Sequence, residues 1–375
     1  MDQALRIIVS GGGTGGHIFP AVSIANAIKA KRPDAHILFV GALGRMEMQR
    51  VPAAGYEIKG LPVRGLIRPL YSLKNIGVII DFLRSKHMAK QIIKNFKPMA
   101  AVGVGGYASG AALDAAHSMG IPCLIQEQNS YAGKTNKMLS QKVQKICVAY
   151  DGMERFFPAE KIIKTGNPVR QNVVHTTITP EEARQQFGLR ADRKTILLVG
   201  GSLGARTINE SMRQHLDMVK AAADVQFIWQ TGKYYFEEMK QAVEAFGKPE
   251  NLVVTDFVSD MGAAYRAADL VISRAGASSI SEFCLIGKAV ILVPSPNVAE
   301  DHQTKNAMAL VKKDAAIYVK DADAPQVLLK QALDLVHNDD KLASLRKNIL
   351  TLGEANSADI IADEVIKMAE AYAQK

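Results

Sequence analysis

The chain has 375 residues, of which 48% are hydrophobic and 22% are charged. This length suits two domains, and the composition is that of a globular protein and not of a disordered one. The first ten residues lack the apolar core of a signal peptide, and no window approaches the ~18 consecutive apolar residues of a membrane span. The three cysteines, Cys123, Cys147 and Cys284, lie far apart in apolar runs, which predicts buried free thiols and no metal site.

The net charge of +9 is spread unevenly along the chain. Residues 1–164 hold 22 of the 46 Lys and Arg residues but only 10 of the 37 Asp and Glu residues. Between residues 59 and 97, nine basic residues stand against Asp81 alone. This excess implies an anionic partner, which could be nucleic acid, phospholipid headgroups or a phosphorylated substrate.

Short apolar segments alternate with amphipathic ones, which predicts an α/β protein with parallel sheets covered by helices. In the first half we expect strands at 5–10, 36–41, 100–104, 123–126, 145–149 and 161–165. In the second half we expect them at 195–199, 225–230, 252–255, 270–273, 289–293 and 316–319. The turn-forming run 166–169 predicts a linker between a domain of residues 1–165 and one of residues 166–356. Residues 357–375 have the apolar spacing of a helix.

A glycine-rich turn, Gly11 to His17, follows the first predicted strand. Glycines let backbone N–H groups approach a ligand, and the helix expected from about Ile18 favours an anion at its start. The same glycines match a dinucleotide fingerprint, but the next strand runs on to Leu43 without the acid that would hold the ribose. An NAD site is therefore disfavoured, and a purely structural turn is the alternative.

A second such turn, Gly200 to Ala205, follows the strand 195–199 and adds Ser202 as a hydroxyl donor to a phosphate. A third glycine cluster, residues 103–110, follows another strand of the first half. Neither of the two turns ends in the Gly-Lys-Ser/Thr of a P-loop, which disfavours ATP hydrolysis. One such turn is weak evidence of a phosphate site, whereas two, each after the first strand of its own α/β domain, are much stronger evidence.

Six motifs then carry a family resemblance: GGTGGH at 12–17, GGY at 105–107, EQN at 127–129, GNPVR at 166–170, GGS at 200–202 and DHQ at 301–303. In this order, over nearly the whole chain, they resemble the MurG family of glycosyltransferases, within family 28. The resemblance implies a GT-B fold: two Rossmann-like, doubly wound parallel-sheet domains facing a cleft, with the helix 357–375 packing back on the first domain. It also implies an inverting transfer of N-acetylglucosamine from UDP-GlcNAc to the C4 hydroxyl of lipid I. The product would be lipid II, used for peptidoglycan synthesis, cell shape and cell division.

By this resemblance the donor UDP-GlcNAc binds mainly to residues 166–356. Phe257 and Val258 would present backbone groups to uracil, and Glu282 would accept hydrogen bonds from both ribose hydroxyls. A carboxylate suits a diol because it offers two acceptor oxygens, although a lone Glu could equally be an exposed helix charge. The other implied donor contacts are Arg170 and Ser202 at the diphosphate, Gln303, Thr304 and Asn306 at the sugar, and Thr14, Gly15, Gly16 and Asn129 from the first domain.

The resemblance assigns the acceptor lipid I to residues 1–165, with contacts from Gly13, Gly105, Gly106, Tyr107 and Asn136. His17 is the candidate general base, since a neutral imidazole near pH 7 can take a proton from a sugar hydroxyl. The alternative is a histidine that contacts a phosphate and transfers no proton. Glu127 is a rival base, or the group that orients one.

Two positions depart from the family pattern. Gln126 stands where some members carry His, which weakens any mechanism that needs a histidine there. Leu203 replaces a Gln common after the GGS motif, so a donor contact from that side chain is absent.

We expect no obligatory protein-bound metal. The run Asp321-Ala322-Asp323 resembles a metal-binding Asp-x-Asp motif, but it lies between a strand and a helix and predicts a solvated turn with a helix cap. UDP departure would then depend on the second turn, Ser202 and Arg170.

Apolar residues between 66 and 83 are interleaved with Arg64, Arg68, Lys74, Arg84 and Lys86. This pattern predicts that the patch 64–86 docks on an anionic membrane surface, or forms a core-facing helix with a basic outer face. The acceptor implied by the resemblance favours a peripheral enzyme on the cytoplasmic face of the bacterial plasma membrane, with cell-wall synthesis proteins as further partners. Nucleic acid is not expected, because no nucleic-acid-binding module is present.

Three other functions stay open at this point. One is a related enzyme that glycosylates another membrane lipid, such as diacylglycerol. Another is an inactive scaffold that binds nucleotide sugar, against which the retention of His17 and Glu127 argues. The third is an NAD-dependent oxidoreductase, which lacks the ribose acid.

Overall fold

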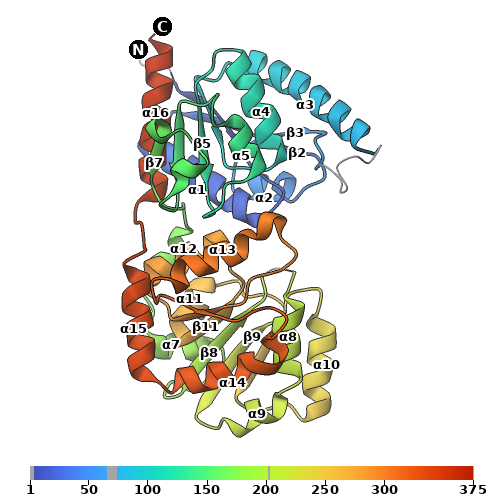
Figure 1. Cartoon of the computed structure of the whole chain (residues 1–375), viewed down its shortest axis with the longest axis vertical. Helices are drawn as coiled ribbons and strands as arrows, with labels where there is room; N and C mark the ends of the chain where they lie inside the picture. Colours follow the sequence, from blue (N-terminus) through green and yellow to red (C-terminus); the bar gives the residue numbers. More distant parts are fainter. Residues whose placement is uncertain (1–3, 66–73, 202, 375) are drawn as a thin grey trace. The chain divides into compact units, whose positions relative to one another are not determined.

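The computed structural model describes residues 4–65, 74–201 and 203–374. They form two compact units (Figure 1). The amino-terminal unit comprises Met1–Val169 and Glu354–Lys375, and the carboxy-terminal unit comprises Arg170–Gly353. The chain therefore passes between units after Val169 and after Gly353, a few residues from the expected boundaries at 165 and 356.

The amino-terminal unit is built on a parallel seven-stranded sheet of order β3-β2-β1-β4-β5-β6-β7. Its strands are β1 (Arg6–Ser10), β2 (His36–Ala42), β3 (Glu57–Leu61), β4 (Ala100–Gly103), β5 (Cys123–Glu127), β6 (Lys145–Val148) and β7 (Ile162–Lys164). The strand order reverses between β1 and β4. In a doubly wound sheet this switch point, at the carboxyl ends of the strands, is where ligands bind.

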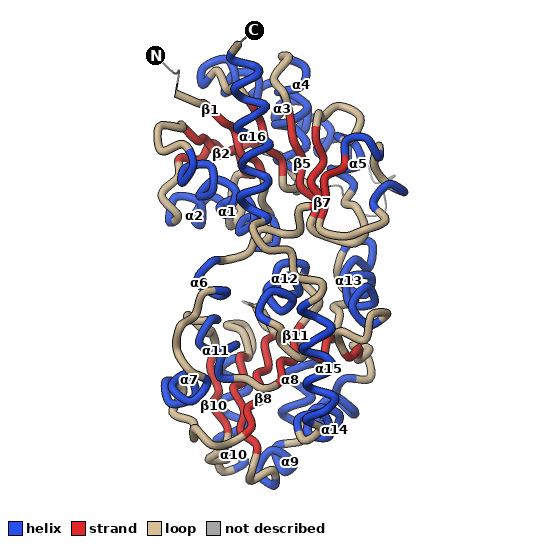
Figure 2. Tube along the Cα trace, turned by 90° about the vertical axis from the view of Figure 1, so that its left-hand side faces the viewer, coloured by secondary structure: helices blue, strands red, loops and turns tan. Residues whose placement is uncertain are grey.

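Helices cover both faces of this sheet: α1 (Gly15–Lys31), α2 (Glu47–Ala53), α3 (Lys74–Phe96), α4 (Tyr107–Ser118), α5 (Lys134–Leu139) and α16 (Ser357–Ala373), with short 3-10 turns η1 (Met153–Arg155) and η2 (Ala159–Lys161). Successive strand residues point to opposite faces. Ile7 and Val9 join the apolar layer beneath α1 and α16, while Ile8 joins the layer beneath α4. The last helix packs along α1 through the fully buried Ile361 and Val365 (Figure 2).

The carboxy-terminal unit repeats the arrangement with six parallel strands in the order β10-β9-β8-β11-β12-β13. These are β8 (Lys194–Val199), β9 (Val225–Gln230), β10 (Leu252–Thr255), β11 (Leu270–Ser273), β12 (Val290–Leu292) and β13 (Ile317–Tyr318). Counted from its own first strand, this sheet repeats the order of the first six strands of the other one, which has β7 in addition. Its switch point lies between β8 and β11.

The helices of this unit are α6 (Gln171–Val174), α7 (Pro180–Gln186), α8 (Arg206–Arg213), α9 (Leu216–Ala221), α10 (Phe236–Phe246), α11 (Met261–Ala267), α12 (Ala277–Ile286), α13 (His302–Val311), α14 (Ala324–Val336) and α15 (Asp339–Leu350), with η3 (Ala299–Asp301) before α13. Leu198 and Trp229 pack on one face with α8 and α14, and Leu197 and Ile228 on the other with α12. The buried Trp229 indole donates to Asn209 Oδ1 at 2.9 Å, which satisfies its only polar atom.

Each strand predicted from the sequence is present, and β3 is an additional strand that the sequence did not predict. Cys123, Cys147 and Cys284 are buried free thiols, as predicted, and burial raises the pKa of each to about 12. Among the described residues, no helix is long and apolar enough to cross a membrane.

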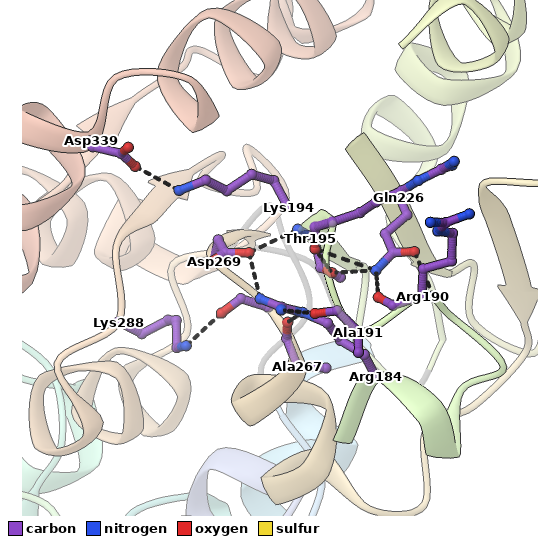
Figure 3. A network of polar contacts seen from close by, with 12 residues as sticks. Arg184, Arg190, Ala191, Lys194, Thr195, Gln226, Ala267, Asp269, Lys288 and Asp339 are labelled. Carbon is purple, nitrogen blue, oxygen red and sulfur yellow. Dashed lines mark hydrogen bonds and ion pairs between the residues drawn. The ribbon is translucent and has the colours of Figure 1, made fainter. Parts of the chain in front are cut away.

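A charged network fixes the amino ends of β8 and β11, away from the switch-point edge (Figure 3). Asp269 Oδ2 accepts from Arg184 Nη2 and from the Thr195 N–H, each at 2.9 Å. Next to it, Lys288 Nζ donates to the carbonyl of Ala268 at 2.7 Å. Burial, together with the positive charge of Arg346, lowers the pKa of Lys288 to about 7 from an ordinary value of 10.5.

This pKa shift makes the stability of the fold depend on pH. Between about pH 7 and pH 10.5 the unfolded chain binds a proton at Lys288 that the folded chain does not, so the free energy of unfolding rises with pH through this window. We expect Lys288→Met to be stabilised relative to the wild type by a few kcal/mol more at pH 6.5 than at pH 9.5, since each pKa unit is worth about 1.4 kcal/mol. Urea unfolding of both chains at the two pH values measures this. Lys330→Met, at an exposed lysine that pairs with Asp334, is the control. If the stability difference from the wild type is independent of pH for both variants, the lowered pKa of Lys288 is contradicted.

Candidate active site

At the switch point of the amino-terminal unit, the turn after β1 and the turn after β4 come into direct contact. A Cβ placed on Gly106 would lie 2.6 Å from the Gly12 carbonyl oxygen, and one on Gly105 would lie 2.9 Å from His17 Nε2. Both glycines have positive φ, +98° at Gly105 and +87° at Gly106. Only glycine permits both this conformation and this close approach. The structure therefore brings together His17, Gly105 and Gly106, as the sequence predicted for one site.

The position of the His17 ring fixes which nitrogen is basic. His17 Nδ1 lies 3.0 Å from the Gly12 carbonyl oxygen, which can only accept a hydrogen bond. The neutral ring therefore carries its proton on Nδ1 and its lone pair on Nε2, the nitrogen on the Gly105 side. The helix α1 begins at Gly15, earlier than the expected Ile18, so His17 lies in its first turn behind the N-cap Thr14. A partly exposed imidazole with a defined tautomer can accept a proton from a sugar hydroxyl.

The turn itself has an anionic neighbour that the sequence analysis did not identify. The buried carboxylate of Glu47, the first residue of α2, accepts a hydrogen bond from the Gly13 N–H at 2.8 Å. The Gly13 N–H, predicted to contact the acceptor, therefore has an internal partner in this structure. Thr14, Gly16 and Tyr107 are exposed at the rim of this site.

Glu127 ends β5 and organises the loop that follows it. Its carboxylate accepts four hydrogen bonds: from the N–H and side chain of Asn129 at 3.0 and 3.2 Å, from the Gly133 N–H at 3.0 Å, and from Asn136 Nδ2 at 2.8 Å. Because the group is also buried, it is suited to orienting this loop rather than to reaching a hydroxyl. Asn136, expected to position substrate, is itself buried and supports Glu127 instead.

Gln126, which replaces a family histidine, belongs to a buried amide network. Its Nε2 donates to Asn167 Oδ1 at 2.8 Å, and Asn167 Nδ2 donates to the Gln128 carbonyl at 3.0 Å. Both side chains are buried, so this network connects the end of β5 to the run 166–169 and has no surface for a ligand.

In the carboxy-terminal unit, the turn after β8 opens onto a cavity of about 970 Å³. The lining includes Gly200, Gly201, Arg274, Gly276, Ser279 and Gln303. Gly276 is the N-cap of α12, whose first turn contains no acidic residue, so the partial positive charge of that helix end faces the cavity. An anion such as a diphosphate suits this arrangement. Ser202, predicted to bind the diphosphate, lies outside the described residues.

Glu282 and Arg170, predicted to bind different parts of the donor, bind each other. Arg170 donates from Nε to Glu282 Oε1 at 2.8 Å and from Nη2 to Oε2 at 3.1 Å. The Tyr265 hydroxyl donates to Glu282 Oε2 at 3.2 Å, and burial and the charge of Glu282 raise the pKa of Tyr265 well above its ordinary value. Glu282 is buried, so the alternative of an exposed helix charge is wrong.

Of the remaining predicted donor residues, some are exposed or line the cavity, and others are buried or already bonded within the protein. Phe257 is 45% exposed with Lys233 Nζ 6.0 Å from its ring centroid, and Gln303 lines the cavity while its Oε1 accepts from the Ser295 N–H at 2.9 Å. Asn306, by contrast, is fully buried and donates to the Ala275 carbonyl in this structure. Val258 is buried and Thr304 Oγ1 donates to Asp301.

The prediction of a solvated turn at 321–323 is wrong for Asp321. Its carboxylate pairs with Arg274 and accepts from the Thr207 hydroxyl, and Arg274 Nη2 donates to Thr207 Oγ1 at 3.0 Å. Arg274 Nη1 also donates to the carbonyls of Val293 and Pro294. Asp321 thus holds an arginine in the wall of the cavity, while Asp323 is exposed and makes no side-chain cap. Among the described residues, no group of three or more His, Cys, Asp or Glu side chains could hold a metal ion.

Two Rossmann-like sheets whose first six strands follow the same order, each with a glycine-rich turn at its switch point, are the architecture of the predicted GT-B class. Residues 7–148 match the glycosyltransferase family 28 N-terminal domain and residues 195–363 match the glycosyltransferase family 28 C-terminal domain. The chain belongs to glycosyltransferase family 28.

Within that family, the chain is similar to proteins with one specific name. It is 64% identical to the UDP-N-acetylglucosamine--N-acetylmuramyl-(pentapeptide) pyrophosphoryl-undecaprenol N-acetylglucosamine transferase of Bacteroides fragilis, over 98% of this chain and 97% of that protein. The protein of the same name from Bacteroides thetaiotaomicron is also 64% identical, over 99% of this chain and all of its own. The crystal structure of Acinetobacter baumannii MurG matches with a TM-score of 0.76 at 28% identity, covering 97% of this chain and 99% of that one.

The two aspartates of the run 321–323 provide a matched pair of variants. We expect Asp321→Asn to raise the KM for the sugar-nucleotide donor about tenfold, because a hydrogen bond to a charged group is worth roughly 1.5–3 kcal/mol and Arg274 loses the negative charge that pairs with it. Asp323→Asn should change KM less than about twofold, since its side chain is exposed. Steady-state kinetics with varied donor tests both. Equal effects of the two substitutions would show that the Asp321 contact does not position Arg274.

Proposed function

We propose that the chain transfers N-acetylglucosamine from UDP-GlcNAc to the C4 hydroxyl of undecaprenyl-diphospho-N-acetylmuramyl-pentapeptide, lipid I, with inversion at the anomeric carbon. The product is lipid II. The observation that carries this proposal is the 64% identity, over nearly the full length of both chains, to transferases named for these two substrates. An enzyme for another membrane lipid, or an inactive scaffold, fits this identity less well.

In the proposed mechanism, His17 is the general base. Nε2 takes the proton of the C4 hydroxyl while that oxygen attacks C1 of N-acetylglucosamine and the bond from C1 to UDP breaks. The fixed Nδ1–H contact to Gly12 supports this role, because it keeps the lone pair on Nε2. Glu127 acts as an orienting group, since its four hydrogen bonds hold the loop 127–136.

The departing diphosphate acquires negative charge that the enzyme has to balance. We place it in the cavity of the carboxy-terminal unit, at the glycine turn after β8 and the start of α12, with Arg274 in the cavity wall. Arg170 is kept as the second predicted diphosphate contact. No protein-bound metal is part of this proposal. The engagement of Asp321 by Arg274 supports that choice, because the carboxylate most similar to an Asp-x-Asp ligand already balances an arginine.

The nucleoside is placed beside the cavity, with uracil at Phe257 and Val258 and ribose at Glu282. Both oxygens of Glu282 are bonded to Arg170 in this structure, so a ribose diol has to displace the guanidinium. A displaced Arg170 keeps its charge and can bind a phosphate instead. After this exchange both residues can make the donor contacts predicted for them.

For the membrane, we propose peripheral binding to the anionic cytoplasmic leaflet through the patch 64–86. Residues 66–73 of the patch lie outside the described residues. On α3, Ile76, Ile79, Ile80 and Leu83 are each 50–60% exposed, next to basic residues. Exposed aliphatic groups beside cations are typical of a surface that inserts shallowly among anionic headgroups.

The transfer reaction is tested with labelled UDP-GlcNAc and a short-chain lipid I analogue. We expect the wild type to form lipid-linked disaccharide and His17→Ala to lower kcat by about 10²–10⁴-fold, the usual contribution of a general base, while UDP binding measured by calorimetry stays the same. His36→Ala, at an exposed histidine of β2, is the control. A wild type that binds UDP but transfers nothing would favour the inactive scaffold. Normal turnover of His17→Ala would exclude His17 as the base.

Membrane binding is tested by cosedimentation with vesicles of phosphatidylethanolamine and phosphatidylglycerol. We expect the double variant Ile79→Ser, Leu83→Ser to lower the bound fraction at least severalfold, because two exposed apolar anchors are lost. Ile360→Ser, at a 39% exposed site on α16, should bind like the wild type. Unchanged binding of the double variant would remove α3 from the membrane surface.

A further inference from the structure

Glu47 is a buried carboxylate at the candidate active site for which the mechanism so far gives no role. It has no exposed surface, and its two oxygens accept from the Gly13 N–H at 2.8 Å and the Ala42 N–H at 3.0 Å. It thereby connects the end of β2 to the glycine turn after β1. Within the part of the chain that the structure describes, no salt bridge is formed by this group.

An unpaired buried carboxylate is costly for a fold, because the charge loses its hydration and here gains only backbone donors. A packed aliphatic side chain would fill the same space without that cost. The neighbouring backbone is shaped for the carboxylate. A Cβ on Gly12 would lie 2.1 Å from Glu47 Oε1, and one on Gly41 would lie 2.6 Å from Glu47 Cγ. Glycines at 12 and 41 thus make room for Glu47.

The same peptide unit that Glu47 contacts controls the catalytic histidine. The Gly12 carbonyl is the group that accepts from His17 Nδ1, and Gly106 packs against it from the other side, since a Cβ there would lie 2.6 Å away. Glu47 therefore holds the Gly12–Gly13 peptide by a hydrogen bond on its N–H side. On its carbonyl side, close packing against Gly106 restricts the movement of the same peptide. A shift of this peptide would turn the His17 ring and remove the hydrogen bond that keeps the proton on Nδ1.

We propose that Glu47 is a positioning residue for His17, acting through the Gly12–Gly13 peptide. This inference rests on the proposed function, in which His17 Nε2 removes the proton from the acceptor hydroxyl. The carboxylate also takes the Gly13 N–H that would otherwise bind an anion. The turn at Gly11–Gly13 then positions His17 and does not primarily bind a phosphate.

The test is a double-mutant cycle between Glu47→Gln and His17→Ala in the transfer assay. In the wild-type background, Glu47→Gln should lower kcat about 10²-fold, the effect of an ångström-scale displacement of a catalytic group. It should leave the KM for UDP-GlcNAc within about twofold. In the His17→Ala background, Glu47→Gln should lower kcat less than about threefold, because the group it positions is gone.

A purely structural role gives a different pattern. Loss of folded protein would lower kcat by the same factor in both backgrounds, and such additivity would overturn the proposal. Glu57→Gln, at an exposed carboxylate of β3 paired with Lys59, is the matched control and should show normal kinetics. If Glu47→Gln does not fold, Glu47→Asp keeps the charge but withdraws it by one methylene, and the same cycle applies. A wild-type chain without transfer would overturn the proposed function and this inference together, whereas a transferring chain with additive variants overturns the inference alone.

Discussion

Close backbone approach between the ends of β1 and β4 is the constraint on which the amino-terminal site depends. Gly12 and Gly106 lie so near each other that a Cβ on Gly106 would overlap a carbonyl oxygen, and a Cβ on Gly105 would overlap the His17 ring. Parallel pairing of β1 with β4 sets this distance, because both turns leave the same edge of the sheet. Alanine at Gly105 would therefore move the imidazole, and alanine at Gly106 would move the Gly12 carbonyl; both would also strain the backbone.

The two units repeat one geometry with opposite electrostatics. Below the turn after β1 lies the carboxylate of Glu47, whereas the wall of the cavity at the turn after β8 contains the guanidinium of Arg274. Backbone N–H groups favour anions in both places, but only the second turn adds a fixed positive charge. Two turns that look alike in sequence are thus suited to different tasks. Under the proposed function, the second binds the diphosphate and the first receives the hydroxyl that gives up a proton.

The sequence predicted the features that are local or periodic, and it missed those that depend on partners far along the chain. Apolar runs and glycine turns predicted the strands and both switch-point turns, because each signal lies within a few residues. The strand β3 was missed because Glu57 and Lys59 interrupt its apolar residues. Glu47 reads as an ordinary helix charge, and only its contact with Gly13 shows otherwise.

The same limit applies to the contacts at the candidate site that the sequence did not predict. The pairing of Arg170 with Glu282 joins residues more than a hundred positions apart, and so does that of Thr207 with Asp321. Asn136 and Asn306 are polar residues beside family motifs, a pattern that indicates proximity to a ligand but not exposure to it. Their burial is decided by how α5 and α13 pack. Gly12 could have given a signal for Glu47. A glycine in a turn can be there to leave room for a neighbouring side chain and not for a ligand, and at Gly12 that neighbour is Glu47.

The return of α16 to the first unit has a consequence for how the protein is made. Residues 357–373 cover part of the sheet that begins at β1, yet a ribosome completes the whole second unit before it reaches them. Until then the apolar layer around Ile7, Val9 and Ile24 lacks the cover that Ile361 and Val365 supply. Vectorial synthesis thus leaves the first unit unfinished while the second can already fold. The amino-terminal unit, although its first strand is made first, is therefore the last to complete its core.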